Sequence, residues 1–238
     1  MDFRSETRSS ETVPSNVGPR EVPEGAGVTS CGGGSTHESC LHASVPSDEI
    51  LAQLRHNSGL VGPDDAGWIS GPLADLTRHI REHHHRYVRE AIPRVRALLA
   101  AAREERNREL PQIEDLEKLF GDVAQEMLMH MQKEEQILFP YIDTLERSAN
   151  GDGSLEPPFF QTVRNPIYTM MKEHDSAEGL VKRIRSTSHD YAFPEGASAS
   201  YRGACRELQT FEADLHEHVH LENNILFPRA AELEAALV

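Results

Sequence analysis

Two segments of the sequence repeat a motif that contains potential metal ligands. Residues 130–140 read HMQKEEQILFP and residues 218–228 read HVHLENNILFP, so each places a histidine four residues before a glutamate. Side chains four positions apart lie on one face of an α-helix, about one turn from each other. Each motif can therefore direct an imidazole and a carboxylate to the same centre.

Two further segments contain histidines that can complete such a centre: the run 83–85 and His174 within KEHD. His85 precedes His130 by 45 residues, and His174 precedes His218 by 44. A duplicated antiparallel helical hairpin with a pseudo-symmetric site explains this near equality. It would place six side chains at one depth, namely His85, His130, Glu134, His174, His218 and Glu222.

Residues of these types inside a helical core favour metal binding. A buried carboxylate without a partner costs several kcal/mol, and a bound cation removes that cost. Mixed imidazole and carboxylate ligands suit iron or manganese, and six ligands exceed the four of a tetrahedral zinc site. The set therefore predicts a centre of two metal ions with open coordination positions.

Four long helices position these residues. We expect helices at 72–102, 112–147, 164–187 and 200–235 from their apolar periodicity and from the loops between them. This pattern predicts an all-α, up-down-up-down antiparallel four-helix bundle. The predicted core stripe of the second helix is Ile113, Leu116, Phe120, Val123, Met127, His130, Glu134, Ile137 and Tyr141. The third and fourth helices have similar stripes through His174 and through His218 with Glu222.

The first helix contains two competing stripes. One, which favours His84 as the inward residue, consists of Leu73, Leu76, Ile80, Tyr87 and Ala91. The other, which shares a seam with His85, consists of Val88, Ile92, Val95 and Leu99. Periodicity alone does not choose between the two histidines. We expect the neighbouring His79, His83, His216 and His220 to lie beside or outside the seam.

The N-terminal part has a different composition. Residues 1–67 form a predicted first segment, largely disordered because its first 45 residues have almost no large apolar side chains. Ile50, Leu51 and Leu54 favour one short helix, and residues 57–72 are typical of a linker. The second predicted domain is 68–238.

The overall composition excludes some classes of function. A net charge of −15 disfavours nucleic acid as a partner. No apolar run approaches the roughly 18–20 residues that cross a bilayer, so we expect no membrane association. Three scattered cysteines predict no disulfide framework, and the N-terminus lacks the apolar stretch of a secretion signal. We therefore expect a cytoplasmic protein.

The motifs resemble a known family. HMxKEEQILFP, HxxLENNxLFP and the intervening KEHD, together with WISGPLA and HIREHHHRYVREAIP, are similar to the iron–sulfur cluster repair di-iron proteins of the RIC (ScdA/YtfE) type over residues 68–231. The resemblance implies a hemerythrin-like domain with two non-haem iron ions, bridged by oxo or hydroxo groups and by carboxylates. It places the first helix's ligand on His85 and the others on His130, Glu134, His174, His218 and Glu222.

The resemblance also implies a role in nitrosative or oxidative stress. Family members are associated with repair of damaged iron–sulfur clusters and some relatives with nitric oxide binding, so iron–sulfur proteins and an electron donor are expected partners. The family's Cys-Cys-Gly-Gly motif is Ser30-Cys31-Gly32-Gly33 in this chain, which shifts the expectation toward nitric oxide binding. The alternatives are a hemerythrin-like protein that binds or senses dioxygen, or a di-iron nitric oxide reductase or peroxidase.

Overall fold

The structure, a computed structural model, describes residues 65–105 and 112–238. A short helix α2 (Ala66–Ser70) precedes four long rods. The first rod consists of α3 (Leu73–Ile80), the π-helical turn η3 (Arg81–His85) and α4 (Arg86–Glu104). The second consists of α5 (Ile113–Lys133), the π-helical turn η4 (Glu134–Leu138) and α6 (Phe139–Ala149). The third is α7 (Arg164–Thr187), and the fourth consists of α8 (Ala199–His220), the π-helical turn η5 (Leu221–Leu226) and α9 (Phe227–Leu237).

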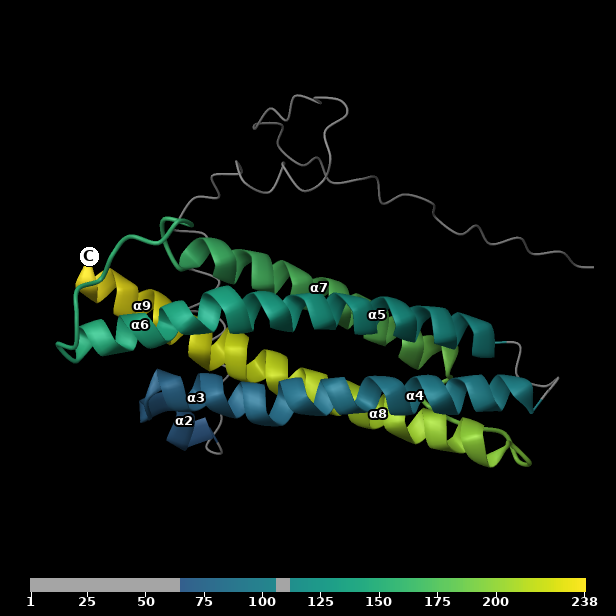
Figure 1. Cartoon of the computed structure of the whole chain (residues 1–238). Coiled ribbons are helices and arrows are strands. Elements are labelled where there is room, and N and C mark those ends of the chain that lie inside the picture. The colour runs from purple at the N-terminus through teal and green to yellow at the C-terminus, as the bar shows by residue number, and fades with distance from the viewer. Residues whose placement is uncertain (1–64, 106–111) are drawn as a thin grey trace, which may run out of the picture. The chain divides into compact units, whose positions relative to one another are not determined.

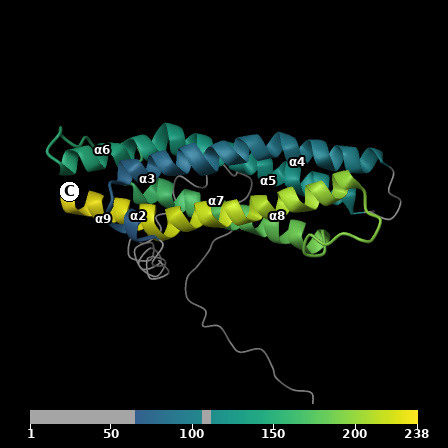
Figure 2. The same cartoon turned by 90° about the horizontal axis from the view of Figure 1, so that it is seen from below.

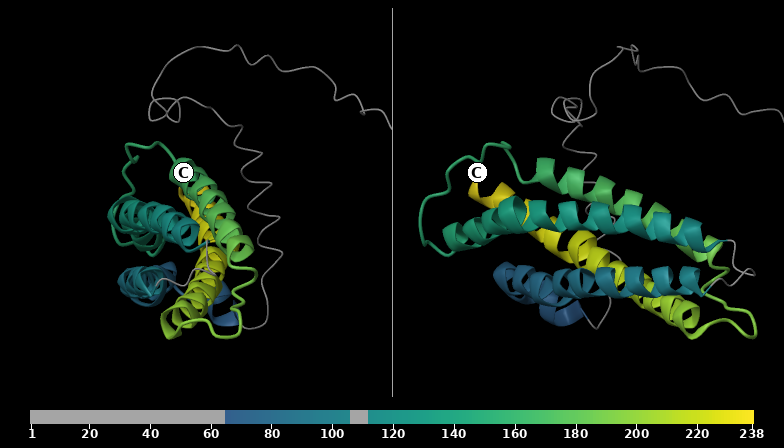
Figure 3. Two further views of the ribbon diagram at one scale, coloured as in Figure 1. Left: turned by 90° about the vertical axis from the view of Figure 1, so that its right-hand side faces the viewer. Right: turned by 45° about the vertical axis from the view of Figure 1, so that its right-hand side comes forward.

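The four rods run alternately up and down and form an antiparallel bundle (Figures 1 and 2). α4 packs along both α5 and α8, and α5 packs along α7, whereas α7 and α8 approach each other over a shorter length. The end-on view of Figure 3 shows the four rods around a common axis. The predicted all-α four-helix bundle is therefore confirmed, with rod ends within two residues of those predicted.

The core of the bundle contains two apolar clusters separated by a polar layer. Phe120 and Phe211 lie in the cluster toward the α4–α5 end, while Ile142 and Phe227 lie in the cluster toward the α6–α9 end. The histidines and glutamates of the predicted site lie between these clusters and are buried with them. The apolar clusters hold the four rods together on both sides of the site.

The π-helical turns change the face that the first, second and fourth rods direct inward. Leu138 is 1 % exposed, whereas Ile137 is 37 % exposed, so the predicted core position at Ile137 is wrong. A π-turn closes i→i+5 rather than i→i+4 and therefore advances the stripe by one residue. The repeated Phe-Pro step favours this turn, because Pro140 and Pro228 are the second residues after it and a proline ring clashes with the carbonyl four residues earlier in a regular helix.

The same effect explains the two stripes of the first helix. Leu76 and Ile80 before η3 are buried, and so are Val88 and Val95 after it. Both stripes therefore face the core, and the change of phase between them lies within η3 itself. The rod needs no bend to direct both halves inward, since the extra residue of the π-turn rotates the second half.

The predicted linker at 57–72 is wrong in its last part, because α2 occupies Ala66–Ser70. Arg229 of α9 holds this segment by donating hydrogen bonds to the carbonyl oxygens of Trp68 and, at 2.6 Å, of Gly71. The short helix predicted near Ile50 and the cysteine at position 31 lie outside the described residues. Among the helices that the structure describes, none combines the length and apolar character that crossing a bilayer requires.

Candidate metal centre

The six residues predicted as ligands lie together between the two apolar clusters. They come from all four rods, and none has more than 3 % of its surface exposed. Their side-chain nitrogen and oxygen atoms form two groups of four, within each of which the atoms lie within 4.8 Å of one another. The His85–His218 cluster contains His85, Glu134, His218 and Glu222. The His130–His174 cluster contains His130, Glu134, His174 and Glu222.

The two carboxylates belong to both clusters. Glu134 Oε2 lies 3.3 Å from His85 Nε2, and Glu134 Oε1 lies 3.2 Å from His130 Nε2. Glu222 Oε1 lies 3.0 Å from His218 Nε2, and Glu222 Oε2 lies 3.1 Å from His174 Nε2. Each carboxylate thus presents one oxygen to each cluster. Separations near 3 Å are those of neighbouring ligand atoms about 2.1 Å from a shared metal ion.

The hydrogen bonding of these atoms fits a bound cation. His85 Nε2, both oxygens of Glu134 and Glu222 Oε2 are buried and make no hydrogen bond with any described residue. Buried polar atoms in native proteins almost always have partners, and a carboxylate buried without one is costly. Coordination to a metal ion would satisfy all four atoms, so the types of ligand present and their lack of hydrogen bonds both fit a bound metal ion.

In the metal-free protein, protonated imidazoles balance the negative charges of Glu134 and Glu222. Burial alone would raise the pKa of Glu222, but the charge of His218, the hydrogen bond from His218 and the adjacent imidazole of His174 hold that pKa well below its usual range. The pKa of Glu134 is also lowered, because the influence of His130 and His85 outweighs burial and the repulsion of Glu222. These carboxylates therefore remain ionised and attractive to a cation.

The imidazoles respond to the same charges. Burial disfavours protonation of His130, yet the adjacent Glu134 and the hydrogen bond to Glu173 raise its pKa to about 10. The pKa of His85 is raised for the same reason, chiefly by Glu134 against burial. The pKa of His218 is lowered, because burial outweighs the attraction of Glu222. A metal that binds these rings must displace the protons held by His85 and His130.

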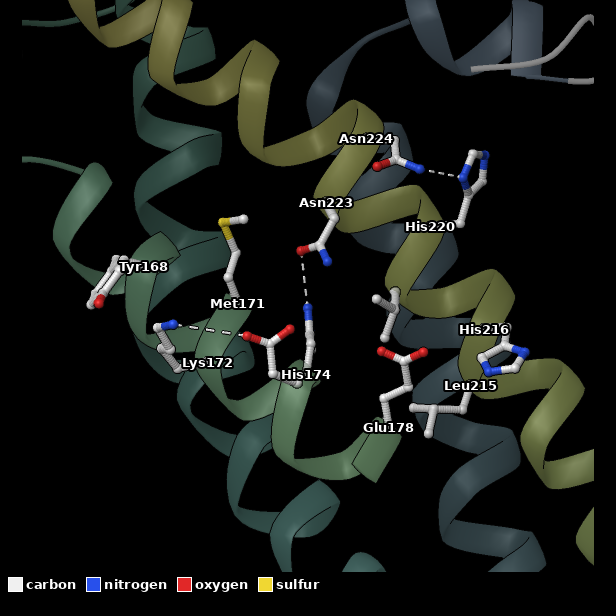
Figure 4. Close-up of a pocket in the computed structure, with 12 residues that line it drawn as sticks. Tyr168, Met171, Lys172, His174, Glu178, Leu215, His216, His220, Asn223 and Asn224 are labelled. Atoms are coloured by element: carbon white, nitrogen blue, oxygen red, sulfur yellow. Dashed lines mark hydrogen bonds and ion pairs between the residues drawn. The ribbon is translucent and has the colours of Figure 1, made fainter. Parts of the chain in front are cut away.

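A second set of residues orients the rings. His85 Nδ1 donates to Glu135 at 2.7 Å, and His130 Nδ1 donates to Glu173 at 3.0 Å. His174 Nδ1 lies 3.0 Å from Asn223 Oδ1 (Figure 4). Because Nδ1 is engaged in each case, Nε2 is directed into the cluster, as in most histidine–metal sites. Sequence reasoning missed these three acceptors, although each stands next to a predicted ligand in the chain.

The structure places His84 outside both clusters. His84 is buried, with 6 % exposed, but its Nδ1 donates to Asp214 Oδ1 at 3.0 Å and its ring stacks on that of His218. His85 is the member of the pair that enters the His85–His218 cluster. His79, His83, His216 and His220 also lie outside the two clusters, in agreement with the sequence-based expectation.

A pocket of about 350 Å³ lies between α7 and α8 and reaches one edge of the centre. Its lining includes His174 together with Tyr168, Met171, Glu178, His216 and Asn223 (Figure 4). It opens where α7 and α8 pack over a shorter length than the other neighbouring rods. Of the six clustered residues, only His174 lines this pocket.

Comparisons with known proteins agree with this geometry. Residues 75–230 match the hemerythrin HHE cation binding domain. The chain is 34% identical over 206 residues to the iron-sulfur cluster repair protein YtfE of Pectobacterium carotovorum subsp. carotovorum (strain PC1), covering 84% of this chain and 85% of the relative. It is 34% identical over 203 residues to the protein of the same name from Escherichia coli O81 (strain ED1a), covering 84% of both chains.

The domain match at 75–230 includes parts of all four rods and all six clustered histidines and glutamates. The domain family is described as cation-binding, and the clusters at the centre of the bundle can hold metal ions. The chain therefore belongs to the hemerythrin HHE cation-binding family and, within it, to the family of the iron-sulfur cluster repair protein YtfE.

Proposed function

We propose that this chain is a non-haem di-iron protein that binds nitric oxide at its metal centre, supplies iron for the repair of damaged iron–sulfur clusters, or does both. The observation that carries the proposal is the sharing of Glu134 and Glu222 between the two clusters. A carboxylate with one oxygen directed at each of two positions is suited to bridge two metal ions. The ligands would be His85, His130, Glu134, His174, His218 and Glu222.

Iron is the metal that fits the proposal best. A mixture of borderline imidazole and hard carboxylate ligands suits iron, and neither cluster includes a cysteine from the described part of the chain. Two ions that share six protein ligands retain open coordination positions, which a diatomic molecule can occupy. When bound, the iron would supply those positions and its redox chemistry, while the protein supplies orientation and a dry surrounding.

The names of the relatives support the biological role. They are called iron-sulfur cluster repair proteins, so we propose that damaged iron–sulfur proteins are partners of this chain in nitrosative or oxidative stress. The pocket beside His174 supports binding of a small ligand, because it reaches the edge of an otherwise buried centre. The cytoplasmic location and the electron donor stay predictions.

Metal analysis followed by nitric oxide titration tests the proposal. Protein purified without oxygen should contain about two iron ions per chain, and the dithionite-reduced form should give the EPR and absorption signals of iron nitrosyls. Addition of the loaded protein to a nitric oxide-damaged iron–sulfur hydratase should restore its activity. His174→Ala should reduce both metal content and nitrosyl signal, whereas His216→Ala, at an exposed pocket position, should keep its metal.

The outcomes separate the candidate functions. One zinc ion or no metal would overturn the proposal of a di-iron centre. Two irons with neither nitrosyl signals nor cluster repair would keep the centre but contradict the proposed function. Reversible oxygenation of the diferrous protein would then favour the dioxygen-binding alternative.

A further inference from the structure

The hydrogen bonds around the centre follow the internal repeat of the sequence. Glu135 directly follows Glu134, and Asn223 directly follows Glu222. Glu135 accepts a hydrogen bond from Nδ1 of His85, and Asn223 does the same for His174. In each half of the repeat, the residue after the shared glutamate therefore orients the histidine of the preceding rod.

A second hydrogen bond to a clustered histidine, accepted by the residue directly before another clustered histidine, exists in only one half of the repeat. Glu173, directly before His174, accepts a hydrogen bond from Nδ1 of His130, and Lys133 pairs with the same carboxylate. The equivalent residue of the other half is His84, directly before His85. If the two halves were equivalent, His84 would accept a hydrogen bond from Nδ1 of His218, as Glu173 does from His130.

His84 lies in the expected place but makes a different contact. Its ring stacks on the ring of His218, with centroids 5.6 Å apart and planes inclined by 11°. Its own Nδ1 is engaged by Asp214. Nδ1 of His218 is buried and makes no hydrogen bond with any residue that the structure describes. Of the four clustered histidines, His218 is therefore the one whose Nδ1 lacks such support within the described chain.

This difference has a direct consequence for metal binding. A histidine that binds a metal through Nε2 holds its proton on Nδ1, and that N–H requires an acceptor when it is buried. Loss of such an acceptor typically weakens metal binding about 10- to 100-fold. Both histidines of the His130–His174 cluster have an acceptor, but only one histidine of the His85–His218 cluster has one.

We infer that the two metal positions are unequal, and that the ion held by His85 and His218 is bound more weakly and released first. The inference rests on the proposed two-metal centre and gives it a direction. One ion is available for transfer, while the other keeps the bundle assembled. His84 is the positioning residue that sets this difference, because it contributes stacking where a hydrogen-bond acceptor would strengthen the ligand.

Stepwise metal titration against a competing chelator tests the inference. Metal-free full-length protein is titrated with Co²⁺ and, without oxygen, with Fe²⁺. Two binding constants that differ by about 10-fold or more are expected, since one acceptor distinguishes the positions. Glu135→Ala should weaken only the weaker step, and Glu173→Ala should weaken only the tighter step. These two variants assign each step to its position.

His84→Glu provides the decisive variant. The new carboxylate can accept from Nδ1 of His218, so the weaker step should tighten about 10-fold or more while the tighter step stays the same. His83→Glu is the matched control, because it adds the same charge at the exposed neighbouring position and should change neither constant. The Co²⁺ absorption band reports whether the number of ligands is unchanged in each variant.

The results distinguish this inference from the proposed function. Wild-type protein that binds fewer than two ions contradicts the two-metal centre itself. Two ions bound with equal constants, or a second ion bound more tightly than the first, would overturn only the inequality of the positions. A folded His84→Glu variant with an unchanged weaker step would also overturn it. If that variant does not fold, Glu135→Ala and Glu173→Ala acting on the same step would contradict the inference.

Discussion

Glu134 and Glu222 stand 88 residues apart in the sequence, yet their carboxylates lie between the same four histidines. Neither side chain is exposed to solvent. Glu134 raises the pKa of His130, and the repulsion that Glu222 exerts on Glu134 is offset by His130 and His85, which lower the pKa of Glu134. The centre of the bundle is therefore a site where the cost of buried charge and the binding of a cation are directly coupled.

We expect removal of the metal to destabilise the bundle. A ligand present at 100 times its dissociation constant stabilises the native state by about 2.7 kcal/mol. Chelation should therefore lower the melting temperature, and Glu222→Ala should lower both the metal content and the melting temperature. Calorimetry with parallel metal analysis measures both. His216→Ala removes an exposed histidine outside the clusters and should match the wild type. Identical melting with and without chelator would contradict the coupling.

The metal-free protein should lose stability at alkaline pH. The pKa of His130 is raised to about 10 in the folded state, against an ordinary value near 6.5. Its stabilising contribution is complete below about pH 6.5 and is lost as the pH rises toward 10, at up to about 1.4 kcal/mol per pH unit. His85 acts in the same direction, since its pKa is also raised.

Urea unfolding at about pH 6.5 and about pH 9.5 measures this loss. Metal-bound imidazoles have no such proton to lose, so the metal-loaded protein should not show it. Equal stability of the metal-free protein at both pH values would show that these histidines are not held protonated by the carboxylates.

A substitution in the apolar cluster beside the site should destabilise the fold without changing how many metal ions the folded protein binds. Phe120 and Phe211 pack edge to face with ring centroids 5.3 Å apart, and both are buried. Phe120→Ala should cost about 3–5 kcal/mol of unfolding free energy, with the metal stoichiometry of the folded protein unchanged. Phe159, which is 84 % exposed, supplies the control. Its replacement by alanine should stay within about 0.5 kcal/mol.

Glu146 should stabilise the start of the first rod. Its two carboxylate oxygens accept from the backbone N–H groups of Leu73 at 2.7 Å and Ala74 at 2.9 Å. These N–H groups have no partner within their own helix, so Glu146→Ala should cost about 0.5–2 kcal/mol in denaturant unfolding. Glu114 lies exposed in the first turn of α5 and is the matched control. Equal effects of the two substitutions would argue against this cap.

The sequence by itself determined the bundle and the residues gathered at its centre. The apolar stripes gave four rods because helical burial requires a 3.6-residue period, and polar residues at stripe positions must share the depth of their neighbours. The 88-residue repeat of His-x-x-x-Glu predicted that two helices would contribute the same pair of side chains. Glu134, Glu222 and the four histidines are therefore brought together as expected, and their role as ligands stays a proposal.

Only the tertiary structure decided which residues face the core after each π-turn and which side chains accept hydrogen bonds from the clustered histidines. A regular helical period cannot place a π-turn, so it predicts Ile137 rather than Leu138 in the core and does not choose between His84 and His85. The acceptors for Nδ1 come from other rods, so helical periodicity alone does not pair them with their histidines. Glu173 and His84 occupy equivalent places in the repeat, yet one accepts a hydrogen bond and the other stacks. That difference depends on side-chain chemistry across the bundle axis, which appears only when the four rods are packed.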